Sequence, residues 1–323
     1  MRYRTLGKTG VQVSNLCFGT MSFGDAADEE SSKAMFKRCR EADINFFDCA
    51  DVYSDGRAEE ILGRCIKDCR EELVITSKVC GKTGDNINDR GLSRRHIQLG
   101  VEESLKRLGT DRIDIYFLHK FDDLTDIEET LRALENLLHQ GKILYSGVSN
   151  WAAWQIEKAL GISARQGLSP FSCIQPMYNL VKRQAESEIL PMAAEENLGV
   201  ITYSPLGGGL LTGKYTTHSK PNTGRLIQRS TYEKRYGDGA YYQVAENFTN
   251  YAKERGYHPA TLAVAWVMEH SAITAPIIGA RNVEQLEVSL AAANLNMTKE
   301  WRAEITSLSI TPAPATDRSE EVK

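Results

Sequence analysis

Short apolar runs recur along the chain, and each is followed by a longer segment in which apolar residues repeat with a helical period. Two of the longer segments, residues 29–42 and 93–109, predict helices, and Ser93 and Gly109 are residue types that commonly open and close a helix. The apolar runs have the length and composition of strands. The predicted strands are, in chain order, 16–18, 44–47, 73–76, 113–118, 143–148, 171–174, 199–202 and 275–278.

These strands are almost continuously apolar, which favours a parallel sheet buried on both faces by the intervening helices. Eight strand–helix units fit 323 residues at about 40 residues per unit, the size of a (β/α)8 TIM barrel with some insertions. The alternative is a doubly wound sheet, but its phosphate-binding fingerprint is incomplete because Gly207 and Gly209 are followed by Thr212. We therefore predict an α/β fold, a (β/α)8 barrel that forms one domain over residues 1–323.

Three segments lie outside the repeating pattern. Residues 2–13, with Gly7 and Gly10 at the bend, predict an N-terminal hairpin that closes the bottom of the barrel. Residues 212–240 predict a long polar loop after the seventh strand, and residues 311–323 predict a flexible tail.

The composition excludes several classes of protein. With 41% hydrophobic and 25% charged residues, the chain is neither disordered nor collagen-like. A net charge of −4 without a basic arm predicts that neither nucleic acid nor a membrane is a partner, and the longest apolar stretch, residues 262–268, is too short to span a bilayer. Seven cysteines and an N-terminus without an apolar leader predict a cytoplasmic protein with free thiols. We expect no metal site, and the sequence leaves open whether the protein is a monomer or a homo-oligomer.

Polar residues follow six of the predicted strands at the point where each strand ends. In a barrel the carboxyl ends of all strands open onto one mouth, where active sites lie. The sequence therefore predicts a ring of hydrogen-bonding groups around one cavity. These residues are Asp48, Ser77, Lys78, His119, Ser149, Asn150, Gln175, Tyr203 and Ser204.

Four residues of this region suit the reduction of a carbonyl group. Tyr53 follows Asp48 by five positions, and a free phenol has a pKa of about 10, too high for easy proton exchange at neutral pH. A neighbouring cation favours the phenolate, so we expect Lys78 to lower the pKa of Tyr53 and Asp48 to keep the buried ammonium charged. His119 can donate a hydrogen bond to the same substrate oxygen. Asp48, Tyr53, Lys78 and His119 are therefore the predicted catalytic residues.

The chain resembles the aldo-keto reductase superfamily, whose Asp-Tyr-Lys-His tetrad these four residues match. The matching motifs cover nearly the whole chain and include FFDCADVYSDGRAEEILG, ITSKV, DIYFLHKFD, YSGVSNW, YSPLGGGLLTGKY and APIIGARNVEQLEVSL. They are most similar to the bacterial and plant branch that carries the SPLxxGLLTGK loop and the GAR cofactor motif. The resemblance implies a (β/α)8 barrel that reduces a small-molecule carbonyl substrate, an aldehyde or ketone, with NADPH (NADP) and with Tyr53 as proton donor.

The resemblance also implies a set of cofactor contacts. The ring of Tyr203 would stack on nicotinamide, and Arg281 would contact the 2′-phosphate, so NADPH is favoured over NADH. Two departures from the family pattern occur: Gly279 stands where relatives outside this branch have lysine, and Val288-Ser289 stands where many relatives have an acid followed by asparagine. The implied cofactor-binding residues are Gly19, Thr20, Asp48, Ser149, Asn150, Gln175, Tyr203, Ser204, Pro205, Leu206, Gly207, Lys214, Gly279, Arg281, Gln285 and Ser289.

The substrate pocket is the least defined part of the prediction. Besides Tyr53 and His119, we expect contacts from Phe23 and Trp151, for which packing in the core is the alternative. One or two tyrosines of the loop after the seventh strand are further candidates. These tyrosines are Tyr232, Tyr236, Tyr241 and Tyr242. Cys49 and Cys80 adjoin the tetrad, and their role is either packing or redox sensing.

Three other functions are alternatives to a reductase. A nicotinamide-binding, redox-sensing regulatory subunit would keep the same barrel with little turnover, as do relatives associated with channels. A Schiff-base aldolase would use Lys78 as a neutral amine, which the neighbouring acid and tyrosine disfavour. A structural scaffold would explain none of the residues at the mouth. The natural substrate and the physiological direction are not determined by the sequence.

Overall fold

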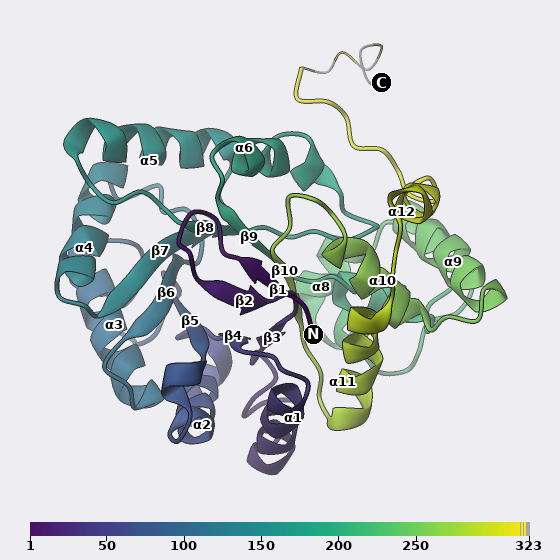
Figure 1. Ribbon diagram of the computed structural model, residues 1–323, viewed down its shortest axis with the longest axis horizontal. Coiled ribbons are helices and arrows are strands. Elements are labelled where there is room, and N and C mark those ends of the chain that lie inside the picture. Colours follow the sequence, from purple (N-terminus) through teal and green to yellow (C-terminus); the bar gives the residue numbers. More distant parts are fainter. Residues whose placement is uncertain (317, 319, 321–323) are drawn as a thin grey trace.

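Eight parallel strands form a closed barrel in the computed structural model, which describes residues 1–316, 318 and 320 (Figure 1). Strands adjacent in the chain pair with each other all the way round, and the last strand closes on the first. Each strand lies within three residues of its predicted bounds, so the predicted (β/α)8 barrel is confirmed. The barrel strands are β3 (Cys17–Gly19), β4 (Phe46–Asp48), β5 (Val74–Val79), β6 (Ile113–Leu118), β7 (Ile143–Ser149), β8 (Cys173–Gln175), β9 (Gly199–Thr202) and β10 (Ala275–Ile278).

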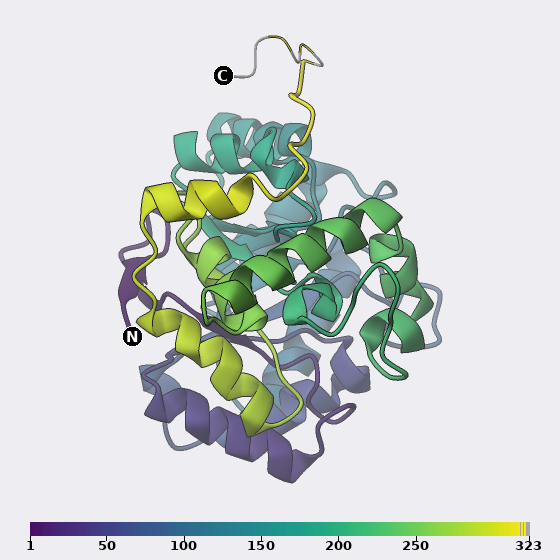
Figure 2. The same ribbon diagram turned by 90° about the vertical axis from the view of Figure 1, so that its right-hand side faces the viewer.

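Helices surround the barrel, and the two residues predicted to begin and end a helix, Ser93 and Gly109, lie at the ends of α3. The side chain of Ser93 accepts a hydrogen bond from the backbone N–H of His96 at the start of α3, and Gly109 ends that helix with a left-handed φ of 62°. Figure 2 shows α11 beside α1, so the last strand–helix unit meets the first. The surrounding helices are α1 (Glu29–Glu41), α2 (Arg57–Ile66), α3 (Arg94–Leu108), α4 (Ile127–His139), α5 (Ala153–Gln166), α6 (Ile189–Glu195), α9 (Gly239–Glu254), α10 (Pro259–Met268), α11 (Val283–Leu290) and α12 (Lys299–Thr306).

The pleat of each strand decides which residues face the barrel axis. Phe47 points outward and packs on Phe36 of α1, with ring centroids 4.9 Å apart. Its neighbours in β4, Phe46 and Asp48, therefore face inward, because successive side chains alternate between the two faces of a strand. The lower interior is filled by an apolar cluster. Its members are Leu6, Val13, Cys17, Phe46, Val74, Ile115, Phe117, Cys173, Ile201 and Ala275.

An antiparallel hairpin of β1 (Tyr3–Thr5) and β2 (Gln12–Ser14) lies across the end of the barrel opposite the mouth (Figure 1). Leu6, in the bend, is fully buried in the interior cluster. A side chain at Gly199 of β9 would place its Cβ 2.5 Å from Cδ1 of Leu6, so glycine is needed there for close approach. The predicted hairpin is confirmed, and Leu6 is the residue that closes the barrel.

The connection after β9 is long, as predicted, but it is not a plain polar loop. It contains the 3₁₀ segment η4 (Gly207–Thr212) and two short helices, α7 (Arg225–Gln228) and α8 (Ser230–Tyr236), which we call the mouth helices. Leu226, Tyr232 and Tyr236 of these helices are buried. Arg229, between the two, forms an ion pair with Asp25 in the loop after β3. The apolar residues in this polar segment order it because they pack on the barrel mouth.

The predicted tail begins with a contact to the barrel. The hydroxyl of Ser187 donates a hydrogen bond to the carbonyl of Ala313 at 2.7 Å. Residues 317, 319 and 321–323 of this segment lie outside the described residues. In the part of the chain that the structure describes, no helix is long and apolar enough to cross a membrane.

Candidate active site

Most of the polar ring predicted from the sequence forms, because its members share the inward face of their strands. Ser77 is the exception: it precedes the inward Lys78 in β5, and its hydroxyl donates to Glu59 of α2 instead of facing the cavity. Asp48 follows the inward Phe46 by two positions, and Lys78 follows the inward Val74 by four. His119 comes directly after β6, two positions beyond another inward residue, Phe117. The same period of two that fills the lower barrel with apolar side chains therefore directs polar side chains to the axis at the mouth.

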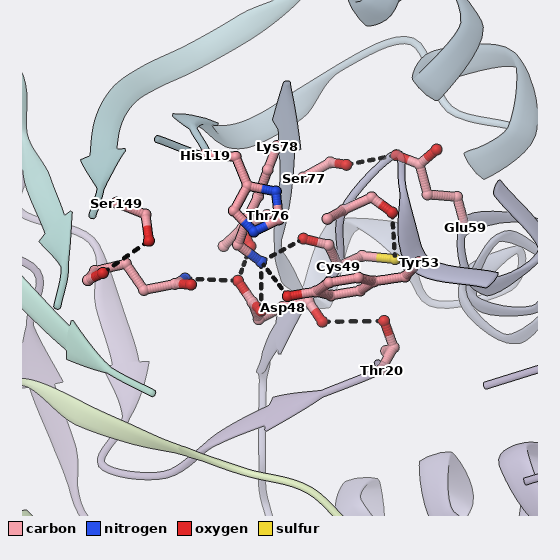
Figure 3. A network of polar contacts seen from close by, with 12 residues as sticks. Thr20, Asp48, Cys49, Tyr53, Glu59, Thr76, Ser77, Lys78, His119 and Ser149 are labelled. Atoms are coloured by element: carbon pink, nitrogen blue, oxygen red, sulfur yellow. Dashed lines mark hydrogen bonds and ion pairs between the residues drawn. The ribbon is translucent and has the colours of Figure 1, made fainter. Parts of the chain in front are cut away.

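Lys78 is the centre of a buried polar network (Figure 3). Its side chain is fully buried, and its Nζ donates hydrogen bonds to Oδ2 of Asp48 at 2.6 Å and to the carbonyl of Cys49 at 2.6 Å. A third contact joins Nζ to the phenol oxygen of Tyr53 at 3.2 Å. The three donors of the ammonium are thus matched by three oxygens, the arrangement that a buried cation needs.

Asp48 is held by donors from two other strands. Its Oδ1 accepts hydrogen bonds from Oγ1 of Thr76 at 2.7 Å and from Nε2 of Gln175 at 2.8 Å. With the Lys78 ammonium on Oδ2, the carboxylate is 2% exposed and fully engaged. Gln175, expected only at the cofactor, therefore also orients the acid of the tetrad.

The charge states of Lys78 and Tyr53 follow from burial and from their mutual contact. Burial lowers the pKa of Lys78, but attraction by Asp48 and Tyr53 and hydrogen bonds to both raise it above the usual lysine value. Burial is the largest effect on Tyr53 and raises its pKa to about 12, although Lys78 acts in the opposite direction. Lys78 thus acts in the expected direction, but the expectation of a lowered tyrosine pKa is wrong, because desolvation of the phenolate outweighs a cation whose charge Asp48 already balances.

His119 lies over the same group of atoms, and its ring meets that of Tyr53 edge to face with centroids 6.0 Å apart (Figure 3). Burial, followed by repulsion from Lys78 and Lys120, lowers the pKa of His119 to about 3. The imidazole is therefore neutral at physiological pH. A neutral imidazole offers one N–H donor without competing for the tyrosine proton.

A second network joins the ends of β7, β8 and β9. The hydroxyl of Tyr203 donates to Oδ1 of Asn150 at 2.6 Å, and Nδ2 of Asn150 donates to the carbonyl of His119 at 2.8 Å and to Oγ of Ser149 at 3.0 Å. Asn150 and Ser204 have left-handed backbones, with φ of 59° and 58°. Such conformations are uncommon for residues with side chains and tend to occur at functional sites.

The two networks lie at one end of a cavity of about 1090 Å³. The cavity extends to Arg281 and Gln285 at the start of α11, so one continuous space connects the tetrad with the expected adenosine end. Most of the predicted residues line it. They are Gly19, Asp48, Tyr53, His119, Ser149, Asn150, Gln175, Tyr203, Ser204, Pro205, Leu206, Lys214, Gly279, Arg281, Gln285 and Ser289.

Four predicted binding residues lie behind the cavity wall. Thr20 is buried, and its hydroxyl donates to the carbonyl of Asp48 at 3.0 Å. Gly207 is buried at the start of η4. Phe23 packs on Phe18, and Trp151 packs between two other aromatic rings, so both large side chains belong to the core in this structure. Phe23 and Trp151 therefore pack in the core, which was the alternative to substrate contact.

Sequence reasoning missed several residues of the wall. Arg225 and Arg235 of the mouth helices line the cavity, as does Tyr215 between η4 and α7. Of the four tyrosine candidates only Tyr232 lines it, whereas the hydroxyl of Tyr236 is turned to Asn179 in the core. The segment was interpreted as a polar loop. Its alternation of arginines and tyrosines was the signal in the sequence that could have identified it as part of the cavity wall.

A buried acidic pair behind the tetrad was also missed. Asp51 is 3% exposed, and neither of its carboxylate oxygens has a hydrogen-bond partner among the described residues. Burial and the neighbouring Glu59 raise the pKa of Asp51 to about 7. Glu59 itself accepts hydrogen bonds from the hydroxyl of Ser77 and from Nε of Arg107, the latter at 2.7 Å. The backbone of Val52 and the charge of Arg107 act in the opposite direction, but burial and Glu59 outweigh them.

The cysteines near the tetrad are thiols in apolar surroundings. Burial raises the pKa of Cys49 well above its usual value and that of Cys80 to about 11. Neither thiol is therefore activated as a thiolate at neutral pH, which favours the packing interpretation. No group of three or more His, Cys, Asp or Glu side chains in the described part of the chain could hold a metal ion.

The cavity has the parts needed to hold an anionic dinucleotide. An aromatic ring (Tyr203) and amide side chains lie at the tetrad end, and the cations Lys214 and Arg281 are among the other residues of the wall. At Gly279 an added Cβ would meet only the carbonyl oxygen of Gly19, at 3.8 Å, so the backbone there is open to close approach. The side chain of Arg281 has no ion pair among the described residues and is free to meet a phosphate.

Comparison with known proteins extends over nearly the whole chain. The profile of the Aldo/keto reductase family matches residues 15–310. An Arabidopsis thaliana protein named "Probable voltage-gated potassium channel subunit beta" is 37% identical over 303 residues, which cover 91% of this chain and 92% of that protein. The "Uncharacterized oxidoreductase YrpG" of Bacillus subtilis (strain 168) is 38% identical over 312 residues, which cover 93% of each chain.

Proposed function

The chain belongs to the Aldo/keto reductase family, a family of oxidoreductases, and from this premise we propose that it reduces aldehydes or ketones to alcohols with NADPH as the cofactor. The observation that carries the proposal is the contact of Tyr53, at the cavity wall, with the buried Lys78–Asp48 ion pair. A phenol placed over a buried ammonium has few structural uses, whereas it suits a proton donor to a developing alkoxide.

The residues of the cavity fit a nicotinamide dinucleotide. Tyr203 would face the nicotinamide ring, with Asn150 and Gln175 at its carboxamide edge. Lys214 and Arg281 would receive the phosphates, and the guanidinium of Arg281 suits the dianionic 2′-phosphate of NADPH. When bound, the dihydronicotinamide supplies the hydride that adds to the carbonyl carbon.

Tyr53 supplies the proton. Its raised pKa of about 12 keeps the phenol protonated at neutral pH, so the acid form is present before the reaction. As the carbonyl π electrons move to oxygen, the phenol proton is transferred to that oxygen and the phenolate forms 3.2 Å from the Lys78 ammonium. The ammonium stabilises this phenolate, and Asp48 ensures that the ammonium is charged when it is needed.

His119 positions the substrate. Because its imidazole is neutral, a ring N–H can donate to the carbonyl oxygen while the proton itself comes from Tyr53. The charged ammonium also argues against a Schiff-base aldolase. That chemistry needs Lys78 as a neutral amine, whereas Asp48 and Tyr53 stabilise its protonated form.

The experiment that tests this proposal replaces Tyr53 by phenylalanine and measures NADPH consumption with a reactive aldehyde such as 4-nitrobenzaldehyde. Loss of a general acid should lower kcat by at least about 10²–10⁴-fold, while NADPH binding, followed by quenching of protein fluorescence, stays within about twofold of the unmodified chain because no phosphate or amide contact is removed.

Tyr3→Phe is the matched control for this experiment. Tyr3 is half exposed, and its hydroxyl donates to the carbonyl of Asp43 on the hairpin side of the barrel. This control should leave kcat unchanged. A Tyr53→Phe variant that keeps most of its turnover would refute the proposed role of the phenol.

A second function is favoured by one comparison, the 37% identity to the plant protein named as a potassium channel β subunit. In that case the chain would bind NADPH as a redox-sensing regulatory subunit and turn over little. A steady-state kcat below about 0.1 s⁻¹ for several reactive aldehydes, at full NADPH occupancy, would favour it, since typical enzymes turn over at about 1–10³ s⁻¹.

A further inference from the structure

Cations dominate the charged residues of the cavity, although the chain as a whole carries a net charge of −4. Asp48 is balanced by Lys78, which leaves Glu284 as the remaining acid on the wall. Such an excess of positive charge favours an anionic occupant. The cations on the wall are Lys120, Lys214, Arg225, Arg235 and Arg281.

Two of these cations belong to the end of the cavity remote from the tetrad. Arg281 precedes α11 and acts electrostatically on Tyr215, and Lys214 acts on His258 beside α10. Both therefore suit the phosphates of the dinucleotide proposed above. Their positions do not account for the cations nearer the tetrad.

Arg235 lies toward the tetrad end. It is on α8, its guanidinium stacks over the ring of Tyr232 at 5.3 Å, and it is close enough to Tyr203 to act on the pKa of that phenol. Tyr203 in turn donates a hydrogen bond to Asn150, and Asn150 donates one to the backbone carbonyl of His119. Together with its place on the cavity wall, this electrostatic link to Tyr203 assigns Arg235 to the part of the cavity near the tetrad rather than to the adenosine end.

Arg235 has no ion pair among the described residues, and its side chain is half buried. The contact with the face of Tyr232 is a cation–π interaction, which does not use the N–H donors of the guanidinium. A half-buried guanidinium without an acidic partner is stabilised by an anion that enters the cavity. Lys120, directly after His119, adds a second cation on the wall without a described ion pair.

We propose that the physiological substrate is a small carbonyl compound that carries an anionic group, a carboxylate or a phosphate, and that Arg235 receives this group while Tyr53 and His119 meet the carbonyl oxygen. The inference rests on the proposed reductase function and specifies the substrate class of the same site. Arg235 is then a residue that determines specificity, and Lys120 strengthens the positive field at the entrance.

The experiment compares carbonyl compounds in pairs that differ in charge. One pair is 4-carboxybenzaldehyde and its neutral analogue methyl 4-formylbenzoate, and the other is glyceraldehyde 3-phosphate and glyceraldehyde. Arg235→Gln should lower kcat/KM for the anionic member of at least one pair by about 10–100-fold, chiefly through KM, because one charge-assisted contact is lost. The neutral members should change by less than about twofold, and so should the Kd of NADPH. The pair that responds distinguishes a carboxylate site from a phosphate site.

Lys234→Gln is the matched control, since Lys234 precedes Arg235 on the same helix and is exposed away from the cavity wall. It removes the same charge and should leave both members of each pair unchanged. Arg235→Lys should retain part of the preference for the anionic member, because a cation remains. Comparing variants on the same substrate cancels the electronic effect of the ring substituent.

The outcomes separate this inference from the function on which it rests. If Arg235→Gln weakens NADPH binding and slows charged and neutral carbonyls equally, the residue serves the cofactor and the inference is overturned. If all four compounds are turned over and Arg235→Gln does not change the preference for the charged member of either pair, the inference is also overturned. The reductase function then stays intact. No turnover of any of them by the unmodified chain overturns the reductase function and this inference together.

Discussion

Replacing Asp48 by asparagine removes one charge of the most buried ion pair in the site. Lys78 is fully buried and Asp48 is 2% exposed, with 2.6 Å between Nζ and Oδ2. Asparagine has nearly the same shape and can still accept hydrogen bonds through its carbonyl oxygen, so the substitution changes charge much more than volume. The buried ammonium of Lys78 is then left without its counter-ion.

The expected loss of stability is large for a single substitution. Breaking a buried pair by removing one partner costs about 3–5 kcal/mol, because the remaining charge stays desolvated. At about 2.1 cal/mol/K per residue, unfolding of 323 residues has an entropy of about 0.7 kcal/mol/K. The Asp48→Asn variant should therefore melt about 4–7 °C below the unmodified chain at pH 7.

The pH dependence of this loss has a defined sign. With Asp48 gone, burial is the main effect on Lys78, and its pKa falls below that of the unfolded chain. Between these two pKa values the unfolded state binds more protons, so the stability of the variant rises with pH. The difference in melting temperature from the unmodified chain should therefore shrink between pH 7 and pH 10.

Thermal and urea unfolding of a double-mutant cycle provide the assay. Asp48→Asn combined with Lys78→Met removes both charges and keeps a side chain of similar length at Lys78, so most of the loss seen in the single variant should be recovered. If the two single losses instead add in the double variant, the pair does not interact and the reasoning is refuted.

Two further predictions concern the adenosine end and the buried acid behind the tetrad. Arg281→Ala should weaken NADPH binding by about 10–100-fold and NADH binding by less than about threefold; equal losses in fluorescence titrations would remove the 2′-phosphate role. The pKa of Asp51 is raised to about 7 in the folded chain against about 3.9 when unfolded, so the folded state binds more protons between these values and stability falls as pH rises through this window. The melting temperature of Asp51→Asn, relative to the unmodified chain, should therefore increase from pH 5 to pH 8, and a difference independent of pH would contradict the assignment.

Much of the fold follows from local patterns. Continuous apolar runs predicted all eight barrel strands, because a strand buried on both faces must be apolar throughout. Ser93 and Gly109 marked the ends of α3 correctly, since capping and a left-handed C-terminus depend on a few adjacent atoms. The positions of Asp48 and Lys78 at the mouth follow from the same strands, because the strand period fixes which side chains face the barrel axis.

The segment after β9 shows where local patterns are insufficient. Its polar composition predicted a loop, yet Leu226 and Tyr236 are buried and the segment forms the mouth helices. Short helices of this kind are ordered by burying a few apolar residues against other parts of the chain, which the segment itself does not reveal. For the same reason Arg235 could not be recognised as part of the cavity wall.

The sequence by itself determined the number and order of the strands, the hairpin at the start and most of the polar residues that follow the strands at the barrel mouth. Only the tertiary structure decided their electrostatics. The pKa of Tyr53 was expected to fall and instead rises to about 12, and Asp51, between Asp48 and Tyr53 in the same motif, is an acid whose pKa is raised to about 7. Spacing along a strand is a property of the backbone, whereas a pKa depends on how much water the surrounding elements exclude and which charges they bring near.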